Sequence, residues 1–308
     1  MALSPANWQK EFLHPLIDRS TYTLRTNRSG SNFDPTETIM NAQITKGTAV
    51  ITGASSGIGA VYADRLAHRG YDLLLVARDQ KRLSERAANL TAKTGRTVEI
   101  FPADLTLRSD LLRVEKRLRS DHTVTALVNN AGFGATSKLI DSKIEELENM
   151  IQLNVTALTR LTAAVLPGFL ERAQGLIINI ASIVALAPEL LNGTYSGTKA
   201  YVVNLTQSLH HEVGNKGIQV QAVLPGATST EFWDRAGLAV HHLPEQTVMT
   251  AEEMVDASLA GLDQQELITI PSLPNLADWQ KFDAARLALG PNLSHKQAAD
   301  RYRIHSVS

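Results

Sequence analysis

The sequence lacks cysteine altogether and contains no long apolar run. Without cysteine, disulfides, thiolate metal sites and cysteine nucleophiles are excluded, and the composition fits a reducing compartment such as the cytoplasm, where we expect the protein to be. The longest apolar runs, such as residues 73–77, reach about five residues, whereas a transmembrane helix needs about 18. We therefore expect a soluble protein without a membrane partner.

Neither sign of charge is in excess. The 30 basic and 31 acidic residues leave a formal net charge of -1, whereas nucleic-acid binding usually requires a basic excess. The nine histidines include adjacent pairs at 210–211 and 241–242, but they lack the spacing of a metal-binding motif. We expect neither a nucleic-acid partner nor a metal site.

The first 39 residues show no regular pattern and include Pro5, Pro15 and Pro35. They lack the apolar segment of a secretory signal, so we interpret them as an irregular N-terminal extension. Met40 is an alternative natural start, in which case residues 1–39 would be an upstream addition. A transit peptide is disfavoured by four acidic residues in this stretch, although its three arginines are typical of one.

From residue 47 onward, short β-branched or leucine-rich runs alternate with stretches of helical periodicity. This alternation predicts an α/β fold, with one doubly wound, Rossmann-type parallel sheet of seven strands in a single domain, residues 40–271. The predicted strands are 48–51, 72–76, 98–101, 126–128, 176–180, 219–224 and 267–270. Thr250 and Glu253 form a capping box that predicts the start of the clearest helix.

Residues 272–308 are predicted to form a C-terminal helical tail. Trp279, Phe282, Ala285 and Leu289 recur at helical spacing and are followed by Gly290. We interpret this apolar face as packing, and a functional tail is the alternative.

The first predicted strand runs directly into a glycine-rich segment, residues 52–59, which a helical pattern follows. Between a strand and a helix, glycines allow a tight turn and let a pyrophosphate approach the helix N-terminus closely. The spacing of Gly53, Gly57 and Gly59 departs from the general Gly-x-Gly-x-x-Gly fingerprint, so the triad alone is a weak indication.

Residues 47–230 resemble the short-chain dehydrogenase/reductase family, motif by motif and in order. Segment 52–59 resembles the family's glycine-rich turn, segment 129–132 resembles its motif after the fourth strand, and Asp104 resembles the residue beside the adenine. Taken alone, segment 129–132 is also ordinary turn chemistry and Asp104 a helix N-cap. The resemblance implies an NADP(H) site formed by Gly53, Ser55, Ser56, Gly57, Ile58, Gly59, Arg78, Asp104, Asn130, Ala131, Gly132, Tyr195, Lys199, Pro225, Gly226, Thr228 and Thr230.

The end of the second predicted strand favours NADP over NAD. Members of the family that prefer NAD have an acid where Ala77 stands, and Arg78 follows it here. An acid would bind the ribose 2′-hydroxyl, whereas a guanidinium grips a 2′-phosphate with its planar fork. Arg78 as a solvated loop cation is the alternative.

Tyr195 and Lys199 stand four residues apart in a helical pattern, so both project from one helix face. A neighbouring cation favours the phenolate, and we therefore expect Lys199 to lower the pKa of Tyr195 from its usual value of about 10. Ser182 directly follows a predicted strand, at the sheet edge where such folds bind ligands. Asn154 is a poor residue for the middle of a helix unless its amide serves a purpose, such as holding a water relayed to Lys199.

These four residues, Asn154, Ser182, Tyr195 and Lys199, match the family's catalytic tetrad. The resemblance implies hydride transfer between NADPH and a carbonyl, with Tyr195 as proton donor, Ser182 polarising the carbonyl and Lys199 holding the nicotinamide ribose. Pro225 to Thr230 resemble the segment that contacts the nicotinamide amide, with Thr228 in place of the usual aliphatic residue.

The predicted substrate is an uncharged, apolar ketone or aldehyde. The segment 230–250, where the family places its substrate lid, is predominantly apolar. A pocket wall or plain core packing explains a further apolar set equally well, namely Phe133, Val184, Leu186, Leu190 and Leu191. A catalytically idle, NADP-sensing protein with the same fold is the alternative function. The predicted long helix with Asn154 and the predicted helix with Tyr195 resemble the surfaces through which family members pair, which implies a homodimer or homotetramer.

Overall fold

The computed structural model describes residues 46–238 and 240–302, so the predicted N-terminal extension, residues 1–39, lies outside the described residues. A seven-stranded sheet forms the centre, with the strand order β3-β2-β1-β4-β5-β6-β9 and parallel pairing throughout. The doubly wound parallel sheet is thus confirmed. Its strands are β1 (Thr48–Thr52), β2 (Asp72–Ala77), β3 (Val98–Pro102), β4 (Val124–Asn129), β5 (Gly175–Ile180), β6 (Ile218–Val223) and β9 (Ile268–Thr269).

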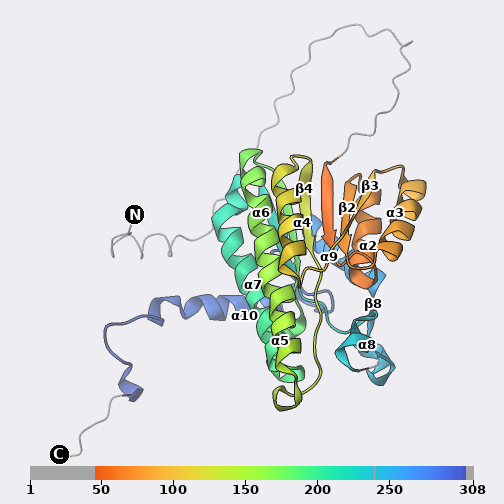
Figure 1. Ribbon diagram of the computed structural model, residues 1–308. Coiled ribbons are helices and arrows are strands. Elements are labelled where there is room, and N and C mark those ends of the chain that lie inside the picture. Colours follow the sequence, from red (N-terminus) through yellow and green to blue (C-terminus); the bar gives the residue numbers. More distant parts are fainter. Residues whose placement is uncertain (1–45, 239, 303–308) are drawn as a thin grey trace, which may run out of the picture. The chain divides into compact units, whose positions relative to one another are not determined.

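Helices cover both faces of this sheet (Figure 1). Neighbouring residues of β1 show why: Val50 packs into one apolar layer and Ile51 into the other, because successive side chains of a strand point to opposite faces. The helices on the Ile51 side are α2 (Gly57–His68), α3 (Gln80–Thr94) and α9 (Ala251–Asp263), and those on the Val50 side are α4 (Arg108–Ser120), α6 (Leu158–Glu171) and α7 (Gly193–Val213). Strands covered on both faces are mostly apolar, as observed here, although Glu99 on β3 and Gln219 on β6 are exposed.

One long helical segment, Ile144–Glu171, combines α5 (Ile144–Ile151), the π-helical turn η2 (Gln152–Ala157) and α6. By length and composition it could cross a membrane, with 44% of its most apolar window buried inside the fold. Leu161 and Phe169 on this segment belong to the core beside the sheet. A core helix of an α/β domain needs the same apolar surface.

A second, two-stranded sheet was not expected from the sequence. In it, β7 (Thr228–Ser229) pairs with β8 (Met249–Thr250). The described residues between these strands, 230–238 and 240–248, form what we call the lid, which contains α8 (Phe232–Ala236), η6 (Val240–His242) and η7 (Glu245–Thr247). Neither strand lies in an apolar run such as the one that marked β9 at residues 267–270, which explains the omission. The predicted cap at Thr250 is present, since its Oγ1 accepts from the Glu253 N–H at 3.1 Å.

The C-terminal tail contains the predicted helix, α10 (Leu276–Ala288), but its apolar face is not packed as expected. Trp279 alone of that face packs against the core cluster around Val202. Phe282 and Leu289 remain at least half exposed, and every residue of α10 keeps part of its side chain accessible. Helical periodicity reports which residues share a face and does not report whether anything covers it. The short helices η1 (Leu139–Asp141), η3 (Ile183–Ala185), η4 (Pro188–Leu190), η5 (Gly214–Lys216), η8 (Gly290–Asn292) and η9 (Asp300–Tyr302) complete the described elements.

Candidate active site

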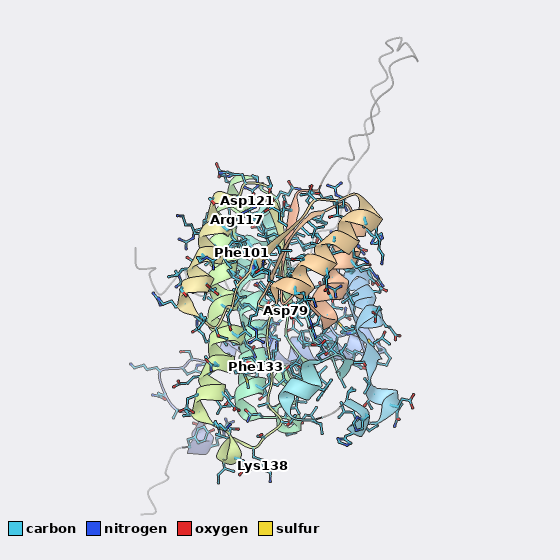
Figure 2. All side chains as sticks on the ribbon, turned by 45° about the vertical axis from the view of Figure 1, so that its right-hand side comes forward. Asp79, Phe101, Arg117, Asp121, Phe133 and Lys138 are labelled. Atoms are coloured by element: carbon cyan, nitrogen blue, oxygen red, sulfur yellow. The ribbon has the colours of Figure 1, made fainter. Side chains whose placement is uncertain are left out.

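A cavity of about 1440 Å³ opens at the carboxyl ends of the strands. Asp121, just before β4, and Phe133, just after it, lie at opposite ends of the sheet in Figure 2, and Phe133 is at the cavity end. Nearly all the residues predicted for the site line this cavity. They are Gly53, Ser55, Ser56, Gly57, Ile58, Arg78, Asp104, Asn130, Ala131, Gly132, Ser182, Tyr195, Lys199, Pro225, Gly226, Thr228 and Thr230, and the two that stand behind the wall are Gly59 and Asn154.

The glycine-rich turn has the backbone shape that a phosphate group requires. Gly53 and Gly57 adopt left-handed conformations, with φ of 68° and 54°. A Cβ on Gly59 would lie 2.4 Å from the Gly53 carbonyl oxygen, so this position admits only hydrogen. Ser56 caps α2 without a side-chain hydrogen bond to any described residue, which leaves the first N–H groups of the helix available to an anion. The turn therefore fits a dinucleotide pyrophosphate.

Thr52 and Asn130 join the ends of β1 and β4. The Thr52 Oγ1 accepts from the backbone N–H groups of Asn130 and Ala131, at 3.0 and 2.9 Å. The Asn130 side-chain amide donates back to the Thr52 carbonyl oxygen at 2.8 Å. Asn130 thus fixes the glycine-rich turn relative to the segment after β4. The sequence placed Thr52 at the start of the glycine-rich segment but predicted no role for its side chain, because only its spatial partners reveal that role.

Arg78 and Asp104 lie at the same end of the cavity. The Arg78 side chain is 66% exposed, and its Nη1 lies 3.9 Å from Asp104 Oδ2. The other carboxylate oxygen of Asp104 accepts from the Thr106 backbone N–H at 3.0 Å and from its hydroxyl at 2.7 Å. Arg78 is therefore held only loosely by this carboxylate, and its guanidinium is accessible to a phosphate in the cavity.

Tyr195, Lys199 and Ser182 converge from two elements. Tyr195 lies in the first turn of α7, where the Asn192 side chain caps the helix by accepting from the Thr194 and Tyr195 N–H groups. Lys199 follows one turn later and donates to the Ile180 carbonyl oxygen at 2.8 Å. Ser182 follows β5 and caps η3. All three side chains are buried.

Asn154 lies behind the wall of the cavity and supports it through hydrogen bonds. Its side-chain N–H₂ donates to the Phe133 carbonyl oxygen at 2.9 Å and to Thr198 Oγ1 at 3.1 Å, while its Oδ1 accepts from the Phe133 N–H at 3.2 Å. The π-helical turn η2 contains this residue, and such turns recur at functional sites. The amide therefore positions the segment after β4, and its relay to Lys199 stays a prediction.

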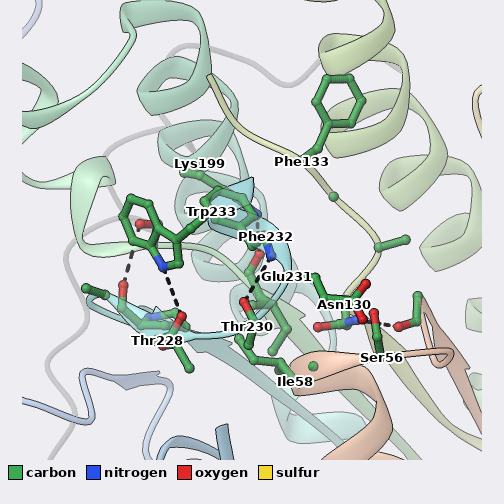
Figure 3. A pocket seen from close by; sticks show the side chains of 18 of the residues that line it. Ser56, Ile58, Asn130, Phe133, Lys199, Thr228, Thr230, Glu231, Phe232 and Trp233 are labelled. Carbon is green, nitrogen blue, oxygen red and sulfur yellow. Dashed lines mark hydrogen bonds between the residues drawn. The ribbon is translucent and has the colours of Figure 1, made fainter. Parts of the chain in front are cut away.

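The lid closes one side of the cavity, as Figure 3 shows. The Phe232 ring lies 5.8 Å from the Tyr195 ring, and the Trp233 indole N–H donates to the Thr228 carbonyl oxygen at 2.9 Å. Around Tyr195 the wall is apolar, since Phe133, Val184 and Leu191 pack there. Of the predicted apolar set, all but Leu186 line the cavity, and Leu186 is instead partly exposed outside it.

The sequence pattern of the short chain dehydrogenase family matches residues 47–239, which is more than half of the chain. The chain belongs to the short-chain dehydrogenase family. It is therefore a member of a family of oxidoreductases that use nicotinamide nucleotides to interconvert alcohols and carbonyl compounds. Its fold and the convergence of Ser182, Tyr195 and Lys199 agree with this membership.

Two solved structures, among others, are similar to this chain over nearly their own whole length. A short-chain dehydrogenase from Sphingobium yanoikuyae in complex with NADPH is 51% identical, with a TM-score of 0.81, covering 83% of this chain and 100% of the other. The bulky-bulky ketone specific alcohol dehydrogenase from Comamonas testosteroni is 44% identical, with a TM-score of 0.78, covering 84% and 99%. The very-long-chain 3-oxoacyl-CoA reductase of Rattus norvegicus is 37% identical over 60% of each chain.

The electrostatics of this short-chain dehydrogenase site differ from the expectation for Tyr195. Burial raises the pKa of Tyr195 to about 12, although the hydrogen bond with Ser182 acts to lower it. Burial also lowers the pKa of Lys199 to about 8. The expected lowering of the Tyr195 pKa by Lys199 is not found, because the Lys199 ammonium lies 5.8 Å from the tyrosine ring centroid and donates to a backbone carbonyl. At neutral pH the Tyr195 hydroxyl is therefore protonated.

Proposed function

We propose that this protein reduces uncharged, apolar ketones or aldehydes with NADPH, with Tyr195 as the proton donor. The observation that carries the proposal is the position of Tyr195, buried beside Ser182 and Lys199 in a cavity that also includes the glycine-rich turn. Carbonyl reduction needs a hydride source and a proton source at the same carbonyl group. One continuous cavity provides room for both.

The residues toward the cofactor have separate roles in this proposal. The glycine-rich turn and the start of α2 would hold the pyrophosphate, and Arg78 would hold the 2′-phosphate. Lys199 would contact the nicotinamide ribose. The bound nucleotide would supply the hydride. The Sphingobium relative, in complex with NADPH, supports NADP(H) as the cofactor.

The proton step follows from the state of Tyr195. Its raised pKa keeps the hydroxyl protonated at neutral pH, so the hydroxyl can hydrogen-bond the substrate oxygen and donate its proton as negative charge develops there. Ser182 would hydrogen-bond the same oxygen and withdraw charge from it. Proton donation leaves a tyrosinate at Tyr195, which has to take up a proton again before the next turnover.

The apolar wall around Tyr195 supports an apolar substrate. Phe133, Val184, Leu191 and Phe232 pack together there, and an ion entering this region would lose its hydration without a partner. The ketone specificity of the Comamonas relative supports a ketone with large groups on both sides. We propose this class of ketone as the preferred substrate.

A substrate panel tests this function. Small ketones, ketones with large apolar groups on both sides, aldehydes and keto acids are supplied with NADPH, and the loss of NADPH absorbance is followed. We expect the highest kcat/KM with bulky apolar ketones. NADPH binding without turnover of any compound would instead support the idle, NADP-sensing protein. In parallel, Arg78→Ala should remove most of the preference for NADPH over NADH, and equal affinities in the unaltered protein would contradict the assignment of Arg78.

A further inference from the structure

An ion pair joins the nucleotide half of the protein to the lid. Arg82 Nη1 donates to both carboxylate oxygens of Glu231, at 2.8 and 2.9 Å. Arg82 belongs to the first turn of α3, and Glu231 is the second residue of the lid. A second carboxylate, Asp79, lies 3.5 Å from Arg82 Nε and orients the guanidinium from its own side. Both members of the ion pair line the cavity.

The ion pair lies where the lid crosses the glycine-rich turn. Thr230, next to Glu231, approaches the turn so closely that a Cβ on Gly57 would lie 3.1 Å from its methyl carbon. Figure 3 shows Thr230 and Glu231 above the start of the α2 helix, beside Ile58. Arg78 and Arg82 both lie in the chain just after β2. The ion pair thus spans the groove from the edge of β2 and α3 to the lid, over the place that fits the pyrophosphate.

The lid is also fixed on its other side. The Ala236 carbonyl oxygen at the end of α8 accepts from the Thr136 hydroxyl at 2.7 Å and from the Thr136 N–H at 3.3 Å. Thr136 belongs to the segment after β4. Between these two attachments, the Phe232 ring contacts Tyr195. The ion pair with Arg82 thus attaches the lid on the nucleotide side, separately from its attachment to Thr136 on the substrate side.

We propose that the Arg82–Glu231 ion pair is a strap across the nucleotide groove that slows the release of the bound dinucleotide. This inference rests on the proposed NADPH-dependent function and identifies Arg82 and Glu231 as positioning residues. Both side chains are about half exposed, at 47% and 44%, so the contribution of the pair is that of a solvent-screened one. The corresponding change in the release rate is about two- to fivefold. Because the strap does not depend on the 2′-phosphate, it acts equally on NADH and NADPH.

The strap is tested by stopped-flow displacement of the bound nucleotide, with the fluorescence of the nucleotide as the signal. Release rates of NADPH and NADH are measured for the unaltered protein, for Glu231→Gln, and for the charge-swapped pair Arg82→Glu with Glu231→Arg. Asp263→Asn is the matched control, because Arg69 donates to both oxygens of Asp263 at 2.8 Å in another bidentate pair, between α2 and α9 and outside the cavity wall. Thermal melting curves check that each variant is folded.

We expect Glu231→Gln to speed the release of both nucleotides by the same factor, and the charge swap to restore slow release of NADH. Asp263→Asn should leave both rates unchanged. Unchanged release from Glu231→Gln, with nucleotide still bound, would overturn the strap and leave the proposed function intact. Slower release of NADPH alone would also overturn it, because Glu231 would then compete with the 2′-phosphate for Arg82. If neither nucleotide bound the unaltered protein, the proposed function itself would fail, and the strap with it.

Discussion

In the proposed reaction the Tyr195 hydroxyl donates the proton, and Tyr195→Phe removes that hydroxyl alone. The ring stays in its apolar surroundings beside Phe232, so the fold and the NADPH affinity should be retained. Turnover should fall by about 10²-fold or more, the usual scale for a positioned acid. Steady-state kinetics with the best ketone of the panel, together with NADPH titration, check this. Near-normal turnover would show that another group donates the proton.

Lys199 makes the reaction sensitive to pH. Its pKa is lowered to about 8 by burial, so the ammonium form predominates below pH 8 and is lost as the pH rises through that value. Because the ammonium is the form that would hold the ribose hydroxyl groups, kcat/KM for reduction should be constant at lower pH and decline above about pH 8. The Tyr195 hydroxyl, with its pKa raised to about 12, stays protonated over the same range.

The pH dependence of NADPH affinity distinguishes deprotonation of Lys199 from a general loss of structure. The affinity should weaken over the same pH interval, while the melting temperature should show no matching fall. Lys199→Ala should weaken both NADPH binding and turnover, unlike Tyr195→Phe. A profile for reduction that is flat through pH 9 would contradict the assigned role of Lys199.

At the scale of single elements, the glycine-rich turn is the segment least tolerant of change. In Gly59→Ala the new methyl carbon would lie 2.4 Å from a carbonyl oxygen and 2.5 Å from the Asn130 amide nitrogen. The turn and the end of β4 would have to separate, which should destabilise the fold by about 1–3 kcal/mol and weaken NADPH binding. Gly197→Ala is the matched control, because a Cβ there meets no described atom within 4 Å and alanine is the better helix former. Thermal melting and NADPH titration of both variants distinguish the two cases, and equal melting temperatures would contradict the packing argument.

Elements with a strong local signal could be predicted from the sequence, and those that depend on distant contacts could not. All seven main strands are present with ends within a few residues of the prediction, because strands buried on both faces need long apolar runs. The β7–β8 pairing and the π-helical turn at Asn154 have no such run. The apolar face of α10 was recognised, but periodicity could not show that Phe282 stays exposed.

The same division holds within the candidate site. Tyr195, Lys199 and the glycine-rich turn could be predicted from the sequence because the chemistry fixes their spacing along the chain. The role of the Thr52 side chain could not be predicted, because its partners Asn130 and Ala131 lie 78 and 79 residues away. Arg82 and Glu231 are separated by 149 residues, and each alone is an ordinary surface charge. The pKa of Tyr195 was misjudged because burial, which a sequence does not report for one side chain, is the largest cause of its shift, and no lowering by Lys199 is found.

At the scale of the whole molecule, we predict a homodimer or homotetramer. Ile144 and Ile151 are exposed on the long helical segment that contains Asn154, and Leu112 is exposed on α4, which packs against α6 of that segment. Covering such side chains removes apolar surface from water. Light scattering at micromolar concentration should give at least twice the chain mass of 33.5 kDa. A strictly monomeric mass would contradict the prediction.

The strand order also determines how the chain must be assembled during its synthesis. β1 lies between β2 and β4, so β2 can cover one of its edges early, while the other stays open until residues 124–129 have been made. Until then, the nascent chain presents an unpaired apolar strand edge, which is a template for association with other chains. Chains that stop before Val124 should therefore aggregate or be held by chaperones, and those that extend past Asn129 can close this edge within their own fold.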